Sequence, residues 1–189
     1  MNHAIAEEQR LLALVASGDQ GALDELYLRY HARLTHYLFQ RLGHNAEWTE
    51  DVLQEVFLNV WYSAKSYQPQ NGSPATWIFG IVHHQLAKAY RSRSRHSVTA
   101  TLPAEMLDDV EDITQGDTEE AIVSRLAMAD AFARLSPKHR EILELVFYQG
   151  FTFEECARIL GVPLGTIKSR MTYARRALLH EVEQSAREG

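Results

Sequence analysis

The stretch TFEECARILGVPLGTIKSRMTYARRALLH, residues 152–180, decides the fold of the C-terminal part of the chain. Thr152 with Glu155 three residues later forms a capping-box pattern, which predicts that a helix begins there. Gly161 and Pro163 predict its end, and a second helix follows them. Apolar residues at helical spacing give this second helix a buried face: Ile167, Met171, Ala174 and Leu178.

The opposite face of the second helix is basic and carries hydroxyl groups. Four Lys or Arg and no Asp or Glu lie between Leu164 and His180. A short helix, a sharp turn and an acid-free helix match the helix-turn-helix geometry, in which the second helix enters the DNA major groove. The alternative is a surface helix with a solvated basic face. The candidate DNA-contacting residues are Lys168, Ser169, Arg170, Thr172, Tyr173 and Arg176.

Size and composition limit the possible classes of protein. A chain of 189 residues forms one domain or two small ones. The single cysteine, Cys156, excludes a disulfide framework and indicates a reducing compartment. There is no signal-peptide pattern and no apolar run near the ~18 residues of a membrane span. We therefore expect a cytoplasmic protein.

The net charge of −6 is unevenly distributed. Residues 1–95 hold nine basic and nine acidic side chains, and residues 121–189 hold ten basic and eight acidic ones. Residues 96–120 hold eight acids and no Lys or Arg. This composition is typical of a linker. We expect two domains, residues 1–95 and 119–189, joined by an acidic flexible linker at residues 96–118.

Apolar periodicity predicts an all-α fold. A short helix is expected at Glu7–Ala16, and Asp19 is placed to cap a long second helix that Gly43 ends. A third helix is expected from about Ala46 to Ala64. A polar loop follows, and Ser73-Pro74 starts a fourth helix that reaches about Arg93. Ser136-Pro137 repeats this start signal in the second domain, where we expect four more helices.

The third predicted helix has an apolar stripe and an acidic outer side. Leu53, Val56, Phe57 and Val60 form the stripe. On the outer side, Leu58 lies among Asp51, Gln54, Glu55 and Asn59. An apolar side chain inside a charged patch suggests a protein interface, although single exposed leucines are also ordinary.

The fourth predicted helix has a core side and an aromatic, basic side. The core side comprises Ile78, Val82, Leu86 and Ala89, flanked by Phe79 and Tyr90. Aromatic and basic residues on one outward face suit nucleic acid, because bases stack on rings and phosphates meet cations. The alternative is that the first two residues of this face are simply core. The face comprises Trp77, Ile81, His84, Lys88 and Arg91.

Patterns for metal binding and catalysis are missing from the sequence. The nine histidines form no pair with ligand spacing, and His83 and His84 are adjacent and so point in different directions on a helix. There is no phosphate-binding loop, nucleophile elbow or cluster of carboxylates. We expect no metal, no cofactor and no catalytic residues.

Taken in order, the motifs resemble one bacterial protein family. DVLQEVFLNVW, ATWIFGIVHH, an acidic linker and LSPKHREILELVFYQGFTFEECARILGVPLGTIKSRMTYARRAL together resemble the extracytoplasmic-function (ECF) class of sigma factors. The resemblance spans roughly Leu11 to Leu179. It implies a dissociable specificity subunit of RNA polymerase rather than an enzyme.

The resemblance also implies roles for the candidate residues. The first domain resembles sigma region 2, with Asp51, Gln54, Glu55 and Leu58 on the surface that docks on the β′ clamp helices. The loop 65–73 and the face with Trp77, His84, Lys88 and Arg91 correspond to the part that captures and opens the −10 element. The second domain resembles region 4, which reads the −35 element. Such proteins also contact the β flap, and an anti-sigma factor often holds them inactive.

One segment departs from the family pattern. Where relatives usually read I-A-R-N and later an Asp, this chain has Ile81, Val82, His83, His84 and then Lys88. The polar contacts that the family makes from those Asn and Asp positions therefore do not carry over. The preference for a particular −10 sequence stays open.

Two other functions are compatible with parts of the sequence. A stand-alone helix-turn-helix regulator would account for residues 119–189 but leaves the two faces of the first domain unexplained. An enzyme with an appended DNA-binding domain would need a catalytic constellation, and the sequence shows none.

Overall fold

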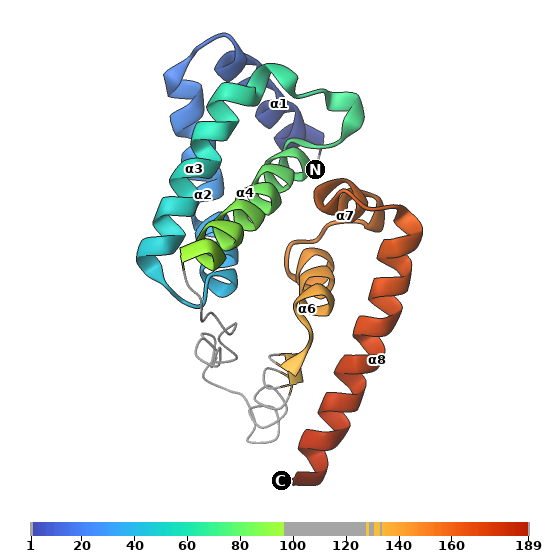
Figure 1. The fold of residues 1–189 in the computed structure, drawn as a ribbon. Coiled ribbons are helices and arrows are strands. Elements are labelled where there is room, and N and C mark those ends of the chain that lie inside the picture. The colour runs from blue at the N-terminus through green and yellow to red at the C-terminus, as the bar shows by residue number, and fades with distance from the viewer. Residues whose placement is uncertain (1, 97–127, 129–130, 133, 189) are drawn as a thin grey trace, which may run out of the picture. The chain divides into compact units, whose positions relative to one another are not determined.

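The computed structural model describes residues 2–96, 128, 131–132 and 134–188 (Figure 1). Every regular element among these residues is helical, as the apolar periodicity predicts. The chain divides into two compact units, with helices α1 to α4 in the N-terminal one and α6, α8 and most of α7 in the C-terminal one. The acidic segment predicted as a linker lies outside the described residues, except for His96.

The first two helices begin and end at local signals. Helix α1 spans Asn2–Ala16 and so begins earlier than the predicted Glu7. Helix α2 spans Gln20–Arg41, and the Asp19 carboxylate caps it by accepting a hydrogen bond from the Ala22 amide at 3.0 Å. Gly43 follows with φ of 70°, a conformation in which glycine avoids the Cβ clash of other residues.

The next two helices are also capped by side chains, and the cap of the second of them is the predicted Ser73. Helix α3 spans Ala46–Ser63, and the Asn45 side chain accepts from the Trp48 amide at 2.8 Å. Helix α4 spans Pro74–His96, and the Ser73 hydroxyl accepts from the Thr76 amide at 3.2 Å. Between them, the predicted polar loop contains two short 3-10 helices, η1 (Ala64–Ser66) and η2 (Pro69–Asn71).

The core of the N-terminal unit lies where α2, α3 and α4 meet. Helix α4 packs along α3, and α2 packs against both α1 and α3. Figure 1 shows α4 crossing this layer diagonally. The predicted stripe of α3 is buried, as are Ile78 and Val82 of α4. Tyr90, predicted beside the core, is instead 37% exposed, because it lies near the end of α4 with its ring against Trp48.

The C-terminal unit is built from shorter helices and one long one. Helix α6 spans Pro137–Leu143, and one π-helical turn, η3 (Glu144–Tyr148), continues it. Helix α7 spans Phe153–Leu160, and α8 spans Leu164–Glu188. The predicted helix before Ser136 falls mainly on residues that are not described. The core of this unit comprises Ile142, Leu145, Cys156, Ile159, Ile167, Met171 and Ala174.

Candidate nucleic-acid interfaces

Local hydrogen bonds set both ends of α7, and the second end forms the turn into α8. At the start of α7, the Thr152 amide donates to the Glu155 carboxylate at 2.9 Å, and the Glu155 amide donates to the Thr152 hydroxyl at 3.2 Å. This is the predicted capping box. At its end, Gly161 has φ of 62°, and the Val162 amide donates to the Ala157 carbonyl at 3.1 Å. That bond is typical of a Schellman motif, which lets the chain reverse sharply into α8.

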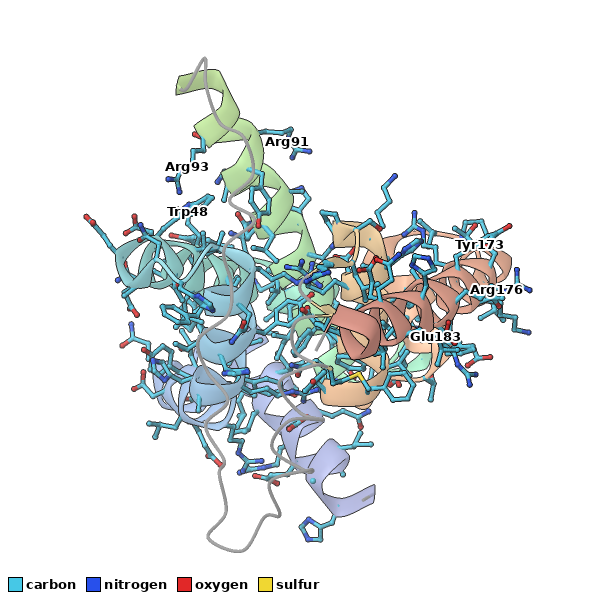
Figure 2. The ribbon with its side chains drawn as sticks, turned by 90° about the horizontal axis from the view of Figure 1, so that it is seen from below. Trp48, Arg91, Arg93, Tyr173, Arg176 and Glu183 are labelled. Carbon is cyan, nitrogen blue, oxygen red and sulfur yellow. The ribbon has the colours of Figure 1, made fainter. Side chains whose placement is uncertain are left out.

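Helix α8 presents the predicted reading face to solvent. Ile167, Met171 and Ala174 are buried on its inner side. Figure 2 shows Tyr173 and Arg176 extending away from the helix. Of the six candidate residues, five are exposed and Arg170 is half-buried at the edge of the face. The sequence therefore placed this face correctly, and its contact with DNA stays a prediction.

The two hydroxyls on this face are already engaged with their own helix. The Ser169 hydroxyl donates to the Thr166 carbonyl, and the Thr172 hydroxyl donates to the Lys168 carbonyl, both at 3.0 Å. Each oxygen keeps lone pairs that can accept a hydrogen bond from a base amino group. The hydrogen-bond donors of this face are supplied by its Lys and Arg side chains.

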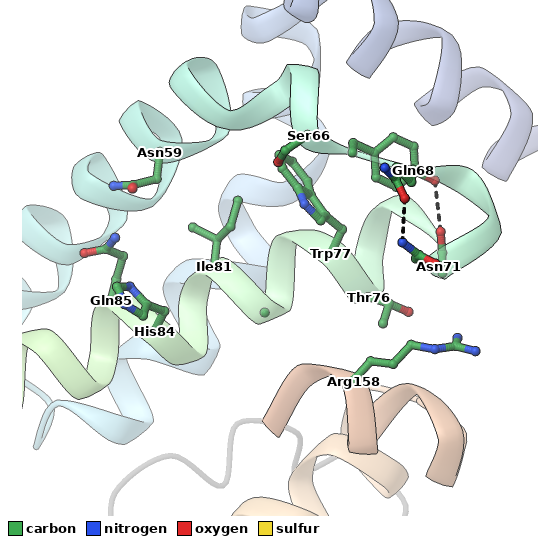
Figure 3. Close-up of a pocket in the computed structure, with 13 residues that line it drawn as sticks. Asn59, Ser66, Gln68, Asn71, Thr76, Trp77, Ile81, His84, Gln85 and Arg158 are labelled. Atoms are coloured by element: carbon green, nitrogen blue, oxygen red, sulfur yellow. Dashed lines mark hydrogen bonds between the residues drawn. The ribbon is translucent and has the colours of Figure 1, made fainter. Parts of the chain in front are cut away.

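The predicted aromatic and basic face of α4 is graded in exposure. Trp77 and Ile81 are half-buried, whereas His84, Lys88 and Arg91 are exposed. Figure 3 shows Trp77, Ile81 and His84 along one side of α4. Half-burial of Trp77 and Ile81 is compatible with both alternatives, so their contact with nucleic acid stays a prediction. Gln85 of α4, which was not selected from the sequence, is buried.

The loop before α4 is ordered by bonds within itself. The side-chain amide of Asn71 donates to the side-chain oxygen of Gln68 at 2.8 Å (Figure 3). The Tyr67 hydroxyl donates to the Gly72 carbonyl at 3.0 Å, and its ring meets the Trp77 ring edge-on with centroids 5.6 Å apart. The loop and the start of α4 thus form one structured surface.

The outer face of α3 is exposed as predicted. Asp51, Gln54 and Glu55 are exposed, and Leu58 is 49% exposed among them. The side-chain amide of Gln54 donates to the Glu50 carboxylate at 3.2 Å. The face is therefore an accessible patch in which one leucine is surrounded by acidic and amide groups.

An ion pair joins this α3 face to the α4 face. The Lys88 ammonium lies 3.2 Å from the Glu55 carboxylate, and both side chains are largely exposed. The two residues are 33 positions apart and were assigned to different surfaces. The structure shows that these surfaces meet.

A second cluster at the end of α4 escaped the sequence analysis. The Arg93 guanidinium lies over the Trp48 ring, 4.4 Å from its centroid, and Tyr90 meets the same ring edge-on (Figure 2). The Tyr90 hydroxyl donates to the Arg41 carbonyl. Stacking on Trp48 orients Arg93. Only the fold brings these residues together, because they lie on three different helices.

Among the described residues, no group of three or more His, Cys, Asp or Glu side chains is suited to a metal ion. Burial raises the pKa of the Cys156 thiol to about 12, so the thiol stays protonated at neutral pH. No helix in the described part of the chain is long and apolar enough to cross a membrane.

Comparison with known proteins accounts for both units. Residues 26–96 match the family model for sigma-70 region 2, and residues 131–180 match that for sigma-70 region 4. The ECF RNA polymerase sigma factor SigK of Mycobacterium sp. (strain KMS) is 31% identical over 175 residues, covering 89% of this chain and 86% of its own. SigL of Mycobacterium tuberculosis (strain ATCC 25618 / H37Rv) is 32% identical over 164 residues, covering 86% and 90%.

The chain belongs to the ECF family of RNA polymerase sigma factors. Sigma factors of this family direct RNA polymerase in transcription initiation and are not enzymes in their own right. The expectation drawn from the sequence motifs is thereby confirmed at the level of family and function. A stand-alone regulator would explain the region 4 match but not the region 2 match.

Two solved structures share the fold. CnrH, in its complex with the cytosolic domain of CnrY, superimposes with a TM-score of 0.65 at 21% identity, covering 94% of this chain and 98% of that one. The sigma factor RpoE of Bartonella quintana, in complex with the anti-sigma factor NepR, gives 0.65 at 22% identity, covering 85% and 96%. At this identity the similarity concerns the fold alone.

Proposed function

We propose that the sigma factor divides its work between three surfaces. The α3 outer face (Asp51, Gln54, Glu55 and Leu58) docks on the β′ clamp helices of core polymerase. The loop 65–73 and the α4 face capture the −10 element, and the exposed face of α8 reads the −35 element. The single observation that carries the proposal is that the sequence-selected residues of α3 and α8 are accessible on faces of opposite charge.

Docking through α3 follows from the mixed character of its outer face. Leu58 offers an apolar contact, and the carboxylates of Asp51 and Glu55 around it favour a partner with basic groups. A partly exposed apolar residue within a polar rim is the usual anatomy of a protein interface. The region 2 match, which includes this helix, agrees with docking on polymerase.

Capture of the −10 element is assigned to the surface that combines rings with cations. Trp77 can stack on an unpaired base, and Arg91 can meet phosphate, as single-stranded nucleic acid requires. His84 is exposed on this face, at the position where relatives carry Asn. We therefore expect the preferred −10 sequence to differ from that of relatives that carry Asn there.

Reading of the −35 element is assigned to α8. Arg176 and Lys168 are exposed on its outer side, and arginine and lysine are the residues that most often contact guanine in the major groove. Ser169 and Thr172 add acceptors beside them. The region 4 match covers this part of the helix.

Domain boundaries and partners complete the proposal. We place region 2 at residues 1–95, the acidic linker at 96–118 and region 4 at 119–189, the last also contacting the β flap. An anti-sigma factor is proposed as the inhibitor, since two solved proteins of this fold are complexes with CnrY and with the anti-sigma factor NepR. Because the partner is RNA polymerase, we place the protein in the cytoplasm.

Run-off transcription tests the proposal directly. Core polymerase from the same bacterium is incubated with genomic promoter fragments, with and without the purified chain. Discrete transcripts that require the chain are expected. Transcripts that are unchanged by the chain, together with tight duplex binding by the chain alone, would favour a stand-alone regulator.

A further inference from the structure

One tyrosine connects the −10 loop to two helices at once. Tyr67 directly follows η1 as its C-cap, and its hydroxyl donates across the loop to the Gly72 carbonyl at 3.0 Å. Its ring also packs edge-on against the Trp77 ring, at 5.6 Å between centroids. The same side chain thereby fixes the far end of the loop and the first aromatic residue of the α4 face.

Helix α1 lies behind this tyrosine, because it packs on η1, the 3-10 helix that Tyr67 follows. Burial raises the pKa of the Tyr67 hydroxyl, so the phenol keeps the proton that it donates to Gly72.

Helix α1 is in turn anchored to the core of the unit. The Tyr30 hydroxyl of α2 donates to the Glu8 carboxylate at 2.8 Å, and Tyr30 is buried. Helix α1 also packs on η1. A helix that is tied to the core thus lies behind the start of the loop.

The bonds of residues 68–71 join loop residues to one another, so the tie between the loop and the helices comes from its ends. Side chains of residues 68–71 are exposed. Gly72 has φ of 149°, which only glycine adopts readily, and a Cβ there would come within 3.4 Å of the Thr76 side chain. Ordering this stretch costs conformational entropy, and fixed contacts at its ends lower the cost of holding a ligand.

We propose that Tyr67 is a positioning residue, which holds the loop 65–72 and Trp77 in the arrangement that receives the single-stranded −10 element. It does so through its hydroxyl, which donates to the carbonyl of Gly72, and through its ring, which contacts Trp77. The inference deepens the proposed function and rests on it where DNA is concerned. The preorganisation of the loop belongs to the free protein.

The central variant is Tyr67→Phe, which keeps the ring and its contact with Trp77 and removes only the hydroxyl. A promoter is first selected from a randomised DNA library with wild-type holoenzyme, and its −10 strand is made as a single-stranded oligonucleotide. Holoenzyme with the variant should bind this oligonucleotide about three- to tenfold more weakly, the size expected from one lost hydrogen bond. Binding of core polymerase and of a duplex carrying only the −35 element should stay unchanged.

Two further variants separate positioning from general damage. Tyr67→Ala, which also removes the ring contact with Trp77, should weaken oligonucleotide binding further than Tyr67→Phe. Tyr148→Phe is the matched control, since Tyr148 is 73% exposed in the C-terminal unit. It should bind the oligonucleotide as the wild type does.

Hydrogen exchange in the free protein tests the device without polymerase. Tyr67→Phe should raise the exchange rate of amides in residues 68–72 while leaving those of α2 and α3 protected. Unchanged exchange in the loop would overturn the inference even if the protein proves to be a working sigma factor. Wild-type oligonucleotide affinity in the variant, or a loss matched by weaker core and −35 binding, would overturn it as well.

Discussion

The Lys88 ammonium and the Glu55 carboxylate are 3.2 Å apart, although they belong to the two faces proposed for DNA and for polymerase. Both side chains are about half exposed or more, so the pair contributes at most about 1 kcal/mol to folding. The pair matters because of where it lies. Each side chain neutralises the charge that the other would offer to its own binding partner. Binding of polymerase at Glu55 would leave Lys88 available to a DNA phosphate.

Exchanging the two charges separates stability from function. The double variant Glu55→Lys with Lys88→Glu restores an ion pair, so its melting temperature should remain close to that of the wild type. Its affinity for core polymerase should still fall, because the docking face then carries a cation. Differential scanning calorimetry and a pull-down with core enzyme measure the two effects. Wild-type core affinity in the exchanged protein would remove Glu55 from the docking face.

Leu58 tests the docking face without involving a charge pair. Leu58→Glu should weaken assembly with core polymerase while leaving helicity and thermal stability nearly intact, because the side chain is 49% exposed. Leu28→Glu is the control on α2, where the leucine is 77% exposed and outside the proposed face. Equal losses in the two variants would show that the effect is not specific to docking.

Arg176 tests the reading of the −35 element. Arg176→Ala should weaken promoter recognition more than core binding, with a cost of about 1–3 kcal/mol and relaxed specificity at one base pair if the side chain contacts a base edge. A phosphate contact would instead lower affinity evenly across sequences. Arg175→Ala, at the edge of the face, serves as the neighbour control. Selection from a randomised −35 library distinguishes these results, and an unaltered profile with unaltered affinity would place Arg176 outside the interface.

The sequence was sufficient for features that depend on local signals. Asp19 and Ser73 cap their helices by bonds to residues three positions away, as their places in the sequence predict, whereas the equivalent cap by Asn45 was not predicted. The exposed face of α8 likewise follows from 3.6-residue periodicity.

Features that join distant helices could not be predicted in this way. Lys88 meets Glu55, and Arg93 meets Trp48, only because α4 packs along α3. The earlier start of α1 was missed because residues 2–6 show little apolar periodicity. The Tyr67 hydroxyl reaches Gly72 across a loop whose shape no repeating pattern encodes.

Cys156 predicts that the stability of the folded protein falls at alkaline pH. Burial raises the pKa of its thiol from 9.0 to about 12 in the folded protein. The unfolded chain therefore releases this proton first, and the stability contributed by the neutral thiol is lost as pH rises from about 9 to 12. Urea unfolding at pH 8 and pH 10 should show a smaller decline in Cys156→Ala than in the wild type. Rapid alkylation of the native protein by iodoacetamide at pH 8 would contradict the buried, protonated thiol.

Promoter binding by the free chain and by holoenzyme is the measurement that tests the account most directly. The free protein has a net charge of −6, and its reading helix offers four basic residues between Leu164 and His180, so few phosphates are neutralised. Core polymerase would hold both units on their elements at once and raise the effective concentration of each. The experiment is a fluorescence-anisotropy titration of one promoter duplex, with and without core enzyme, at a single near-physiological salt concentration. The account predicts tight, sequence-specific binding only when core enzyme is present, whereas nanomolar sequence-specific binding by the free chain would contradict it.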